Sequence, residues 1–145
     1  MKAPEISSSY CEADFDLLGF HDCYLHGIRW HPSEFAFVLY LDYIVQWVEP
    51  PSQKDSFRLW ICKAELRFVN VDETRMVLDW GAWAPECQID ALNRTETRTT
   101  PSGRKQWLWE LEMSIPDGEI IFWATGFQLK ILGPPVLSDV QYLRR

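Results

Sequence analysis

Histidine and aspartate gather near the start of this chain, where imidazole and carboxylate groups could act together. His21, Asp22 and His26 lie close in sequence, and such groups can bind zinc or exchange protons near neutral pH. Successive side chains of a strand point to opposite faces, so His21 cannot converge with Asp22 or His26 unless the strand bulges. We therefore expect no metal site, and His21 and His26 are the candidate ligands if one exists.

His21 and Asp42 make the better pair for proton transfer. We expect both on the less apolar face of the first hairpin, where the carboxylate could orient the imidazole as a general base. A structural ion pair needs the same geometry. Cys23 should lie opposite Asp42, which would raise the pKa of its thiol and make it a poorer nucleophile. The chain has no GxSxG, HExxH or P-loop motif, so no enzyme class is positively indicated.

Glu110 and Glu112 form a second acidic pair, two residues apart on one face of a predicted strand. Paired carboxylates could cleave a sugar bond, but this pair is expected on an outer face beside Glu119. A solvated acidic strip is the simpler interpretation. Trp123 is expected on the same face, so Glu110, Glu112 and Trp123 are candidate binding residues for a protein partner.

Trp80 and Trp83 are candidate binding residues for a different reason. They flank a break in the alternating pattern that begins at Gly81. Tryptophan combines a large apolar surface with a polar N–H group, which suits both a binding patch and the mouth of a barrel. We expect the tryptophans inside continuous strands to belong to the core or its cover.

The histidines and Asp42 must be positioned by the stretch 20–47, which predicts two long strands joined by a turn at 31–34. Pro32 occupies the second position of that turn, as a type I turn favours. Pairing Trp30 with Phe35 would place Asp42 across from Cys23 and diagonally near His21.

Further strands are predicted along the rest of the chain. A hairpin with its turn at 115–118 should bury one face. That face carries Trp107, Trp109, Leu111, Met113, Ile120, Phe122 and Ala124. We also expect a bulged strand over 57–70 followed by 74–80, so that Phe68 meets Val77, and a strand over 88–92. The polar segment 94–105 predicts either an edge hairpin or a mobile loop.

Composition indicates a single mainly β domain over residues 1–145. The chain is 47% hydrophobic and contains eight Trp, eight Phe and five Tyr, which suit the broad surfaces of sheets. Seven or eight strands are expected, joined mostly by short turns into an antiparallel meander that forms a barrel or a sandwich. Acidic and apolar residues over 11–19 predict a short N-terminal helical turn.

Net charge and terminal sequence limit the partners. Lys and Arg total 14 against 21 Asp and Glu, and the formal charge of −7 disfavours nucleic acid and suits a basic protein partner. No signal peptide or membrane span is recognisable, so we expect a cytoplasmic protein with no membrane partner. The four cysteines contain no CxxC pair and are expected to be reduced. No cofactor is indicated.

Three short motifs carry a resemblance: FHD at 20–22, LYLDY at 39–43 and FWATGF at 122–127. Together they resemble small uncharacterised bacterial β-rich proteins, some of which are immunity proteins for polymorphic toxins. The resemblance implies a cytoplasmic protein that neutralises a toxin by binding it, with no catalytic residues to carry over.

Three hypotheses follow. The first is an acidic, immunity-like interaction protein without enzymatic activity. The second is a barrel that binds a small apolar ligand in its interior. The third is a hydrolytic or metal-dependent enzyme that uses His21 and Asp42. Exposed edge strands would also permit a symmetric homodimer.

Overall fold

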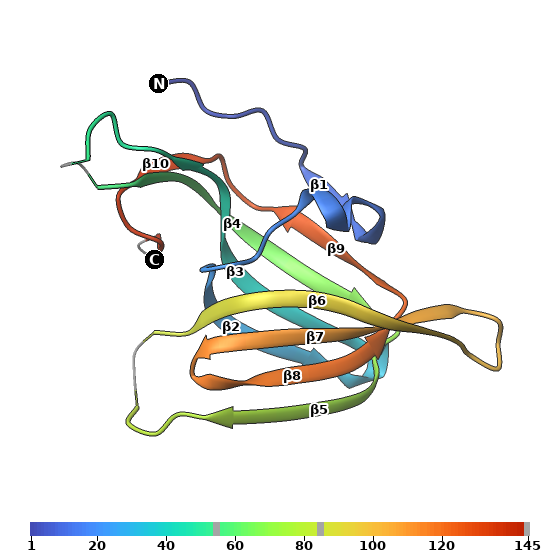
Figure 1. Cartoon of the computed structure of the whole chain (residues 1–145). Helices are drawn as coiled ribbons and strands as arrows, with labels where there is room; N and C mark the ends of the chain where they lie inside the picture. Colours follow the sequence, from blue (N-terminus) through green and yellow to red (C-terminus); the bar gives the residue numbers. More distant parts are fainter. Residues whose placement is uncertain (54–55, 84–85, 144–145) are drawn as a thin grey trace.

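A computed structural model describes residues 1–53, 56–83 and 86–143 (Figure 1). Within them, ten strands form one antiparallel sheet in the order β1-β9-β4-β3-β2-β6-β7-β8-β5, and β10 also pairs with β4. The strands are β1 (Ser9–Cys11), β2 (Tyr24–His31), β3 (Ala36–Val48), β4 (Arg58–Val69), β5 (Asp72–Asp79), β6 (Gln88–Thr99), β7 (Lys105–Ile115), β8 (Asp117–Ala124), β9 (Gly126–Ile131) and β10 (Val136–Ser138). Two short 3-10 turns complete the described elements, η1 (Glu12–Leu17) and η2 (Pro32–Glu34).

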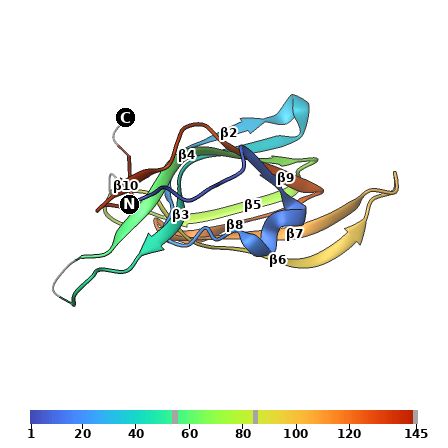
Figure 2. The same ribbon diagram turned by 90° about the horizontal axis from the view of Figure 1, so that it is seen from above.

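The mainly β fold and the short N-terminal helical turn are confirmed, whereas closure into a barrel is wrong. Strands β1 and β5 are the two ends of the sheet and do not pair with each other. The sheet bends between β2 and β6, which share a single residue pair, Tyr24 with Gln88. Strands β5 to β8 thereby lie across from β3 and β4 (Figure 1, Figure 2).

Aromatic side chains from both halves of the sheet fill the space between them. The ring of Phe122 on β8 lies 4.7 Å from that of Phe68 on β4 and 5.4 Å from that of Phe37 on β3. Phe68 also contacts the ring of Trp109 on β7 at 5.3 Å, and all four side chains are fully buried. Strands of one continuous sheet therefore build the core.

The first hairpin forms with a register different from the predicted one. Trp30 pairs with Phe37, two residues beyond Phe35, because η2 and a left-handed Phe35 (φ 51°) lengthen the connection. A shift of two residues leaves the side chains between Gly27 and the turn on their predicted faces. A bulge between Leu25 and Gly27 then reverses the alternation, so that Tyr24 faces Asp42.

The second hairpin confirms the predicted core face, again with a register shifted by two residues. Trp109 pairs with Phe122, and Leu111 pairs with Ile120. The predicted core residues of β7 and β8 are buried except Trp107, which is only half-buried.

The predicted order of strand pairing is wrong in part. Strand β5 does not return along β4, because Val77 pairs with Glu119 on β8 and does not meet Phe68. The expected bulge of β4 lies instead in its partner β3, between Ile44 and Gln46. The segment 94–105 is a hairpin, since β6 and β7 stay paired as far as Thr99 and Lys105 and project beyond the sheet (Figure 1, Figure 2).

No helix among the residues that the structure describes is long and apolar enough to span a lipid bilayer.

Candidate functional site

The bulge in β2 pairs Asp42 with His26 and not with His21. His26 Nε2 donates a hydrogen bond to Asp42 Oδ2, which also accepts the main-chain N–H of Leu143 at 2.8 Å. The Asp42 carboxylate is fully buried, so these donors compensate the loss of its hydration. Gly27 was the available signal, because a glycine inside a strand pattern often marks a bulge.

His21 lies before β2 and is held by two other acids. Its Nδ1 donates to the main-chain carbonyl of Asp90 at 2.9 Å, and its Nε2 lies 3.2 Å from Asp22 Oδ2. The hydrogen bond to the Asp90 carbonyl raises the pKa of His21 and is the largest effect. Burial lowers this pKa in part, and the charges of Asp22 and Asp90 raise it again. The side chain is 68% exposed, so this is a solvated ion pair.

The candidate metal ligands are not assembled. His21 is bonded to Asp22 and Asp90, whereas His26 is bonded to Asp42. Over residues 1–53, 56–83 and 86–143, no group of three or more His, Cys, Asp or Glu side chains could hold a metal ion.

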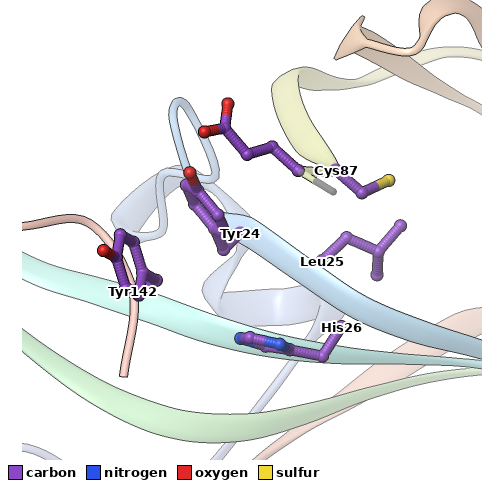
Figure 3. A pocket seen from close by; sticks show the side chains of 6 residues that line it. Tyr24, Leu25, His26, Cys87 and Tyr142 are labelled. Atoms are coloured by element: carbon purple, nitrogen blue, oxygen red, sulfur yellow. The ribbon is translucent and has the colours of Figure 1, made fainter. Parts of the chain in front are cut away.

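A hollow of about 370 Å³ lies beside His26 (Figure 3). Its lining includes Tyr24, Leu25, Cys87 and Tyr142. Burial raises the pKa of the Cys87 thiol, and the sulfur points away from the imidazole of His26 (Figure 3). The pair is therefore not arranged as a Cys–His nucleophile.

Cys23 is also poorly suited to attack a substrate. Its side chain is fully buried, and this desolvation raises the pKa of its thiol to about 12. The thiol is therefore protonated near neutral pH.

The predicted acidic pair lies on the outer face of the half formed by β5 to β8. Glu112 pairs with Glu119 across β7 and β8, and Asp117 lies at the start of β8. We call Glu110, Glu112, Asp117 and Glu119 the acidic outer face. No Lys or Arg nitrogen in the described parts of the chain lies within 4.0 Å of these carboxylates. Like charges on directly opposed residues repel each other, and no ion pair among the described residues offsets the repulsion between Glu112 and Glu119, although Asn93 Nδ2 donates to Glu112 at 3.4 Å.

Apolar and polar groups surround the acidic outer face. A hollow of about 420 Å³ is lined by Glu112, Asp117 and Glu119 together with Arg75 and Val77. Ile121 pairs with Glu110 on the same face. The surface thus mixes negative charge with exposed apolar area.

Trp123 lies at the far end of this outer face, where it pairs with Leu108. The Arg98 guanidinium covers its ring at 4.2 Å and also donates to Glu73 at 3.0 Å. Trp123 therefore already has a cationic partner within the chain.

Trp80 and Trp83 stack on each other just after β5, with ring centroids 4.4 Å apart. Trp83 is 78% exposed. Asp79, the last residue of β5, pairs with Asp117 of the acidic outer face. Trp80 follows Asp79 directly in the chain, so the stacked tryptophans begin next to that end of the face.

Sequence reasoning missed a second aromatic group, formed by Tyr24, Trp47, Phe57 and Tyr142 around one hollow. These residues come from distant parts of the chain, and only the position of the C-terminal segment brings Tyr142 to Tyr24.

The chain matches no family model, and no curated protein and no solved structure is significantly similar to it.

Proposed function

We propose that this protein is a non-enzymatic interaction protein whose acidic outer face binds a basic surface of another protein. The observation that carries the proposal is the set of four carboxylates that form no ion pair within 4.0 Å in the described residues, with Arg75 as the one cationic side chain in the hollow beside them. A complementary positive surface would relieve the repulsion between Glu112 and Glu119.

Exposed apolar groups beside the carboxylates support the same function. Val77 and Ile121 lie among the acidic side chains, and the stacked pair of Trp80 and Trp83 extends from the same end. Protein interfaces combine a desolvated apolar centre with polar groups that set orientation and association rate. A partner could therefore gain both charge pairing and apolar contact here.

The class of partner rests on the resemblance to immunity proteins, which suggests a toxin encoded beside this chain and a cytoplasmic site of action. The binding surface itself is argued from charge and exposure alone. A basic partner that is not a toxin would therefore support the surface and contradict the immunity assignment.

The decisive experiment removes charge from the proposed surface and measures affinity. The neighbouring gene's product is titrated with the wild-type protein and with the variant E110Q/E112Q/E119Q. We expect Kd to rise about tenfold or more, since each exposed charge pair contributes up to about 1 kcal/mol. The wild-type affinity should also fall as salt is raised.

A matched control neutralises three exposed acids elsewhere, Glu5, Asp16 and Glu49, and changes the net charge equally. Its Kd should stay within about twofold of wild type, because distant exposed charges are screened. If both variants weakened binding equally, the change in Kd would reflect the change in net charge alone, which would contradict a specific binding surface. Failure to bind any neighbouring product would end the immunity assignment.

The other two hypotheses gain no support from the fold. A barrel that encloses an apolar ligand needs a closed sheet, whereas this sheet is open and Trp109 and Phe122 fill the space between its halves. An enzyme based on His21 and Asp42 needs the two side chains together, and they have different partners.

A further inference from the structure

Four aromatic side chains surround a hollow at the end of the molecule where β10 pairs with β4. The hollow has a volume of about 370 Å³, within the range of roughly 300–1,000 Å³ that is common for small-molecule sites. Tyr24, Trp47, Phe57 and Tyr142 line it, and Leu59 is the buried residue beneath them. Asp139, Val140 and Gln141 complete the lining.

Strand pairing explains why these groups meet. Leu59 on β4 pairs with Trp47 on β3 and with Ser138 on β10, so it lies between the two. Phe57 precedes Leu59 by two residues and therefore shares its face. The chain after β10 then turns back toward β2, where the Tyr142 ring lies 5.2 Å from that of Tyr24.

Hydrogen bonds to distant groups hold the C-terminal wall of the hollow. Leu143 N–H donates to the buried Asp42 carboxylate at 2.8 Å. Gln141 Oε1 accepts from Gln88 Nε2 at 3.2 Å, and the same amide donates to Asp22 at 3.1 Å. The wall is thus positioned before any ligand arrives, which lowers the entropy cost of binding.

The aromatic rings are exposed in spite of their size. Trp47 is 41%, Phe57 54% and Tyr142 44% accessible to solvent. Clustered exposed aromatic surface is uncommon unless it binds something.

The charge of the lining indicates what this surface would bind. Among the residues that the structure describes, no Lys or Arg lines the hollow, and the one acidic side chain in its lining is Asp139. The adjoining hollow on the other side of Tyr24 and Tyr142 adds Glu86. Elsewhere in the described chain Arg94, Arg98 and Lys105 already lie over aromatic rings, but none lies over these four.

We propose that this aromatic hollow binds a small quaternary ammonium compound. The electron-rich faces of Trp, Tyr and Phe attract a cation, and a methylated ammonium loses less hydration than a metal ion when rings surround it. The exposed Asp139 of the lining supplies the opposite charge. The hollow lies away from the acidic outer face, so this proposal stands independently of the proposed function.

The first test separates charge from shape. Choline and its neutral isostere 3,3-dimethylbutan-1-ol are titrated into the full-length protein by calorimetry. We expect choline to bind about tenfold more tightly, because cation–π attraction to several rings favours the charged ligand. Equal affinity, tighter binding of the neutral alcohol, or no binding of choline would overturn the proposal.

The second test locates the site. Trp47→Leu should weaken choline binding about tenfold. Trp47→Phe keeps an aromatic face, so its choline affinity should fall by less than that of Trp47→Leu. Trp83→Leu is the matched control, because Trp83 is also an exposed tryptophan but lies on the loop after β5, away from the hollow. The choline affinity of this variant should equal that of the wild-type protein. Wild-type affinity in Trp47→Leu would overturn the assignment, and an unchanged thermal midpoint shows that the variants fold.

Discussion

At the scale of single residues, Asp42 connects segments that are far apart in the sequence. Its buried carboxylate accepts hydrogen bonds from His26 on β2 and from the main chain of Leu143. An unpaired buried carboxylate is strongly unfavourable, so this requirement links β3 to the strand bulge and to the C-terminus. The pair between His26 and Asp42 therefore has a structural explanation that needs no catalysis.

His21 gives a prediction about pH. Its pKa lies above the ordinary value of 6.5, chiefly because of the hydrogen bond to the Asp90 carbonyl. Folding thus favours the protonated form, and this contribution is complete below pH 6.5 and is lost as the pH rises through the raised pKa. An NMR titration of the imidazole should give a midpoint above 6.5.

Substituting His21 separates its pH-dependent contribution to stability from those of the other histidines. Denaturant unfolding of His21→Gln should show a deficit against wild type that is larger at about pH 5 than at about pH 9. Asp22→Asn should lower the pKa of His21, because it removes a nearby negative charge. A deficit that grows with pH would contradict the assigned sign.

At the scale of elements, β5 depends on one glycine in the neighbouring strand. Gly118 has a φ of 146°, and a Cβ atom there would lie 2.0 Å from the carbonyl oxygen of Val77. Such a contact cannot be relieved by a side-chain rotation, since it involves the main chain of β5. The close pairing of β5 with β8 therefore requires glycine at this position.

We expect Gly118→Ala to detach β5 and to lower the free energy of unfolding by roughly 1–3 kcal/mol. Hydrogen exchange should become faster for the amides of β5 that pair with β8. Gly133→Ala is the control, because a Cβ atom at Gly133 meets nothing within 4 Å, and it should leave exchange unchanged. Equal protection of β5 in both variants would contradict the close approach.

The free ends of the sheet also belong to this scale. Among the described strands, β1 and β5 each have a neighbour on one side only. Unpaired strand edges can add a second chain, so the symmetric homodimer stays a prediction.

At the scale of the whole molecule, the aromatic core joins the two halves of the sheet. Phe122 contacts Phe37 and Phe68 across the bend, while main-chain hydrogen bonds at the bend join residues 22–25 to 87–89 only. We therefore expect packing of these buried rings to contribute strongly to holding the halves together.

Phe122→Ala should accordingly lower the free energy of unfolding by about 3–5 kcal/mol, the usual cost of deleting a buried aromatic ring. Phe57→Ala, which removes the same atoms from an exposed site, should cost about 0.5 kcal/mol or less. Chemical denaturation of both variants measures the difference. Similar losses would mean that the contact between the halves is not the main source of stability.

The sequence alone determined most of the long strands and the buried face of the second hairpin. However, it predicted seven or eight strands where the described residues form ten, and it placed the fully buried Cys23 and Asp42 on the less apolar face. Alternation with a period of two is a local property, and a register error of two residues does not change the face of any side chain. For this reason Trp109, Leu111 and Phe122 were correctly assigned to the core although both predicted registers were wrong. The outward position of Glu110 and Glu112 followed from the same alternation.

Only the tertiary structure decided which distant groups meet. Whether β5 pairs with β4 or β8, and whether His21 or His26 reaches Asp42, depends on a bulge and on packing between segments far apart in sequence. The aromatic hollow likewise depends on the C-terminal segment, in which Leu143 donates to Asp42, Gln141 accepts from Gln88, and Tyr142 lies against Tyr24. These choices depend on the total energy of non-local contacts, which no local pattern encodes.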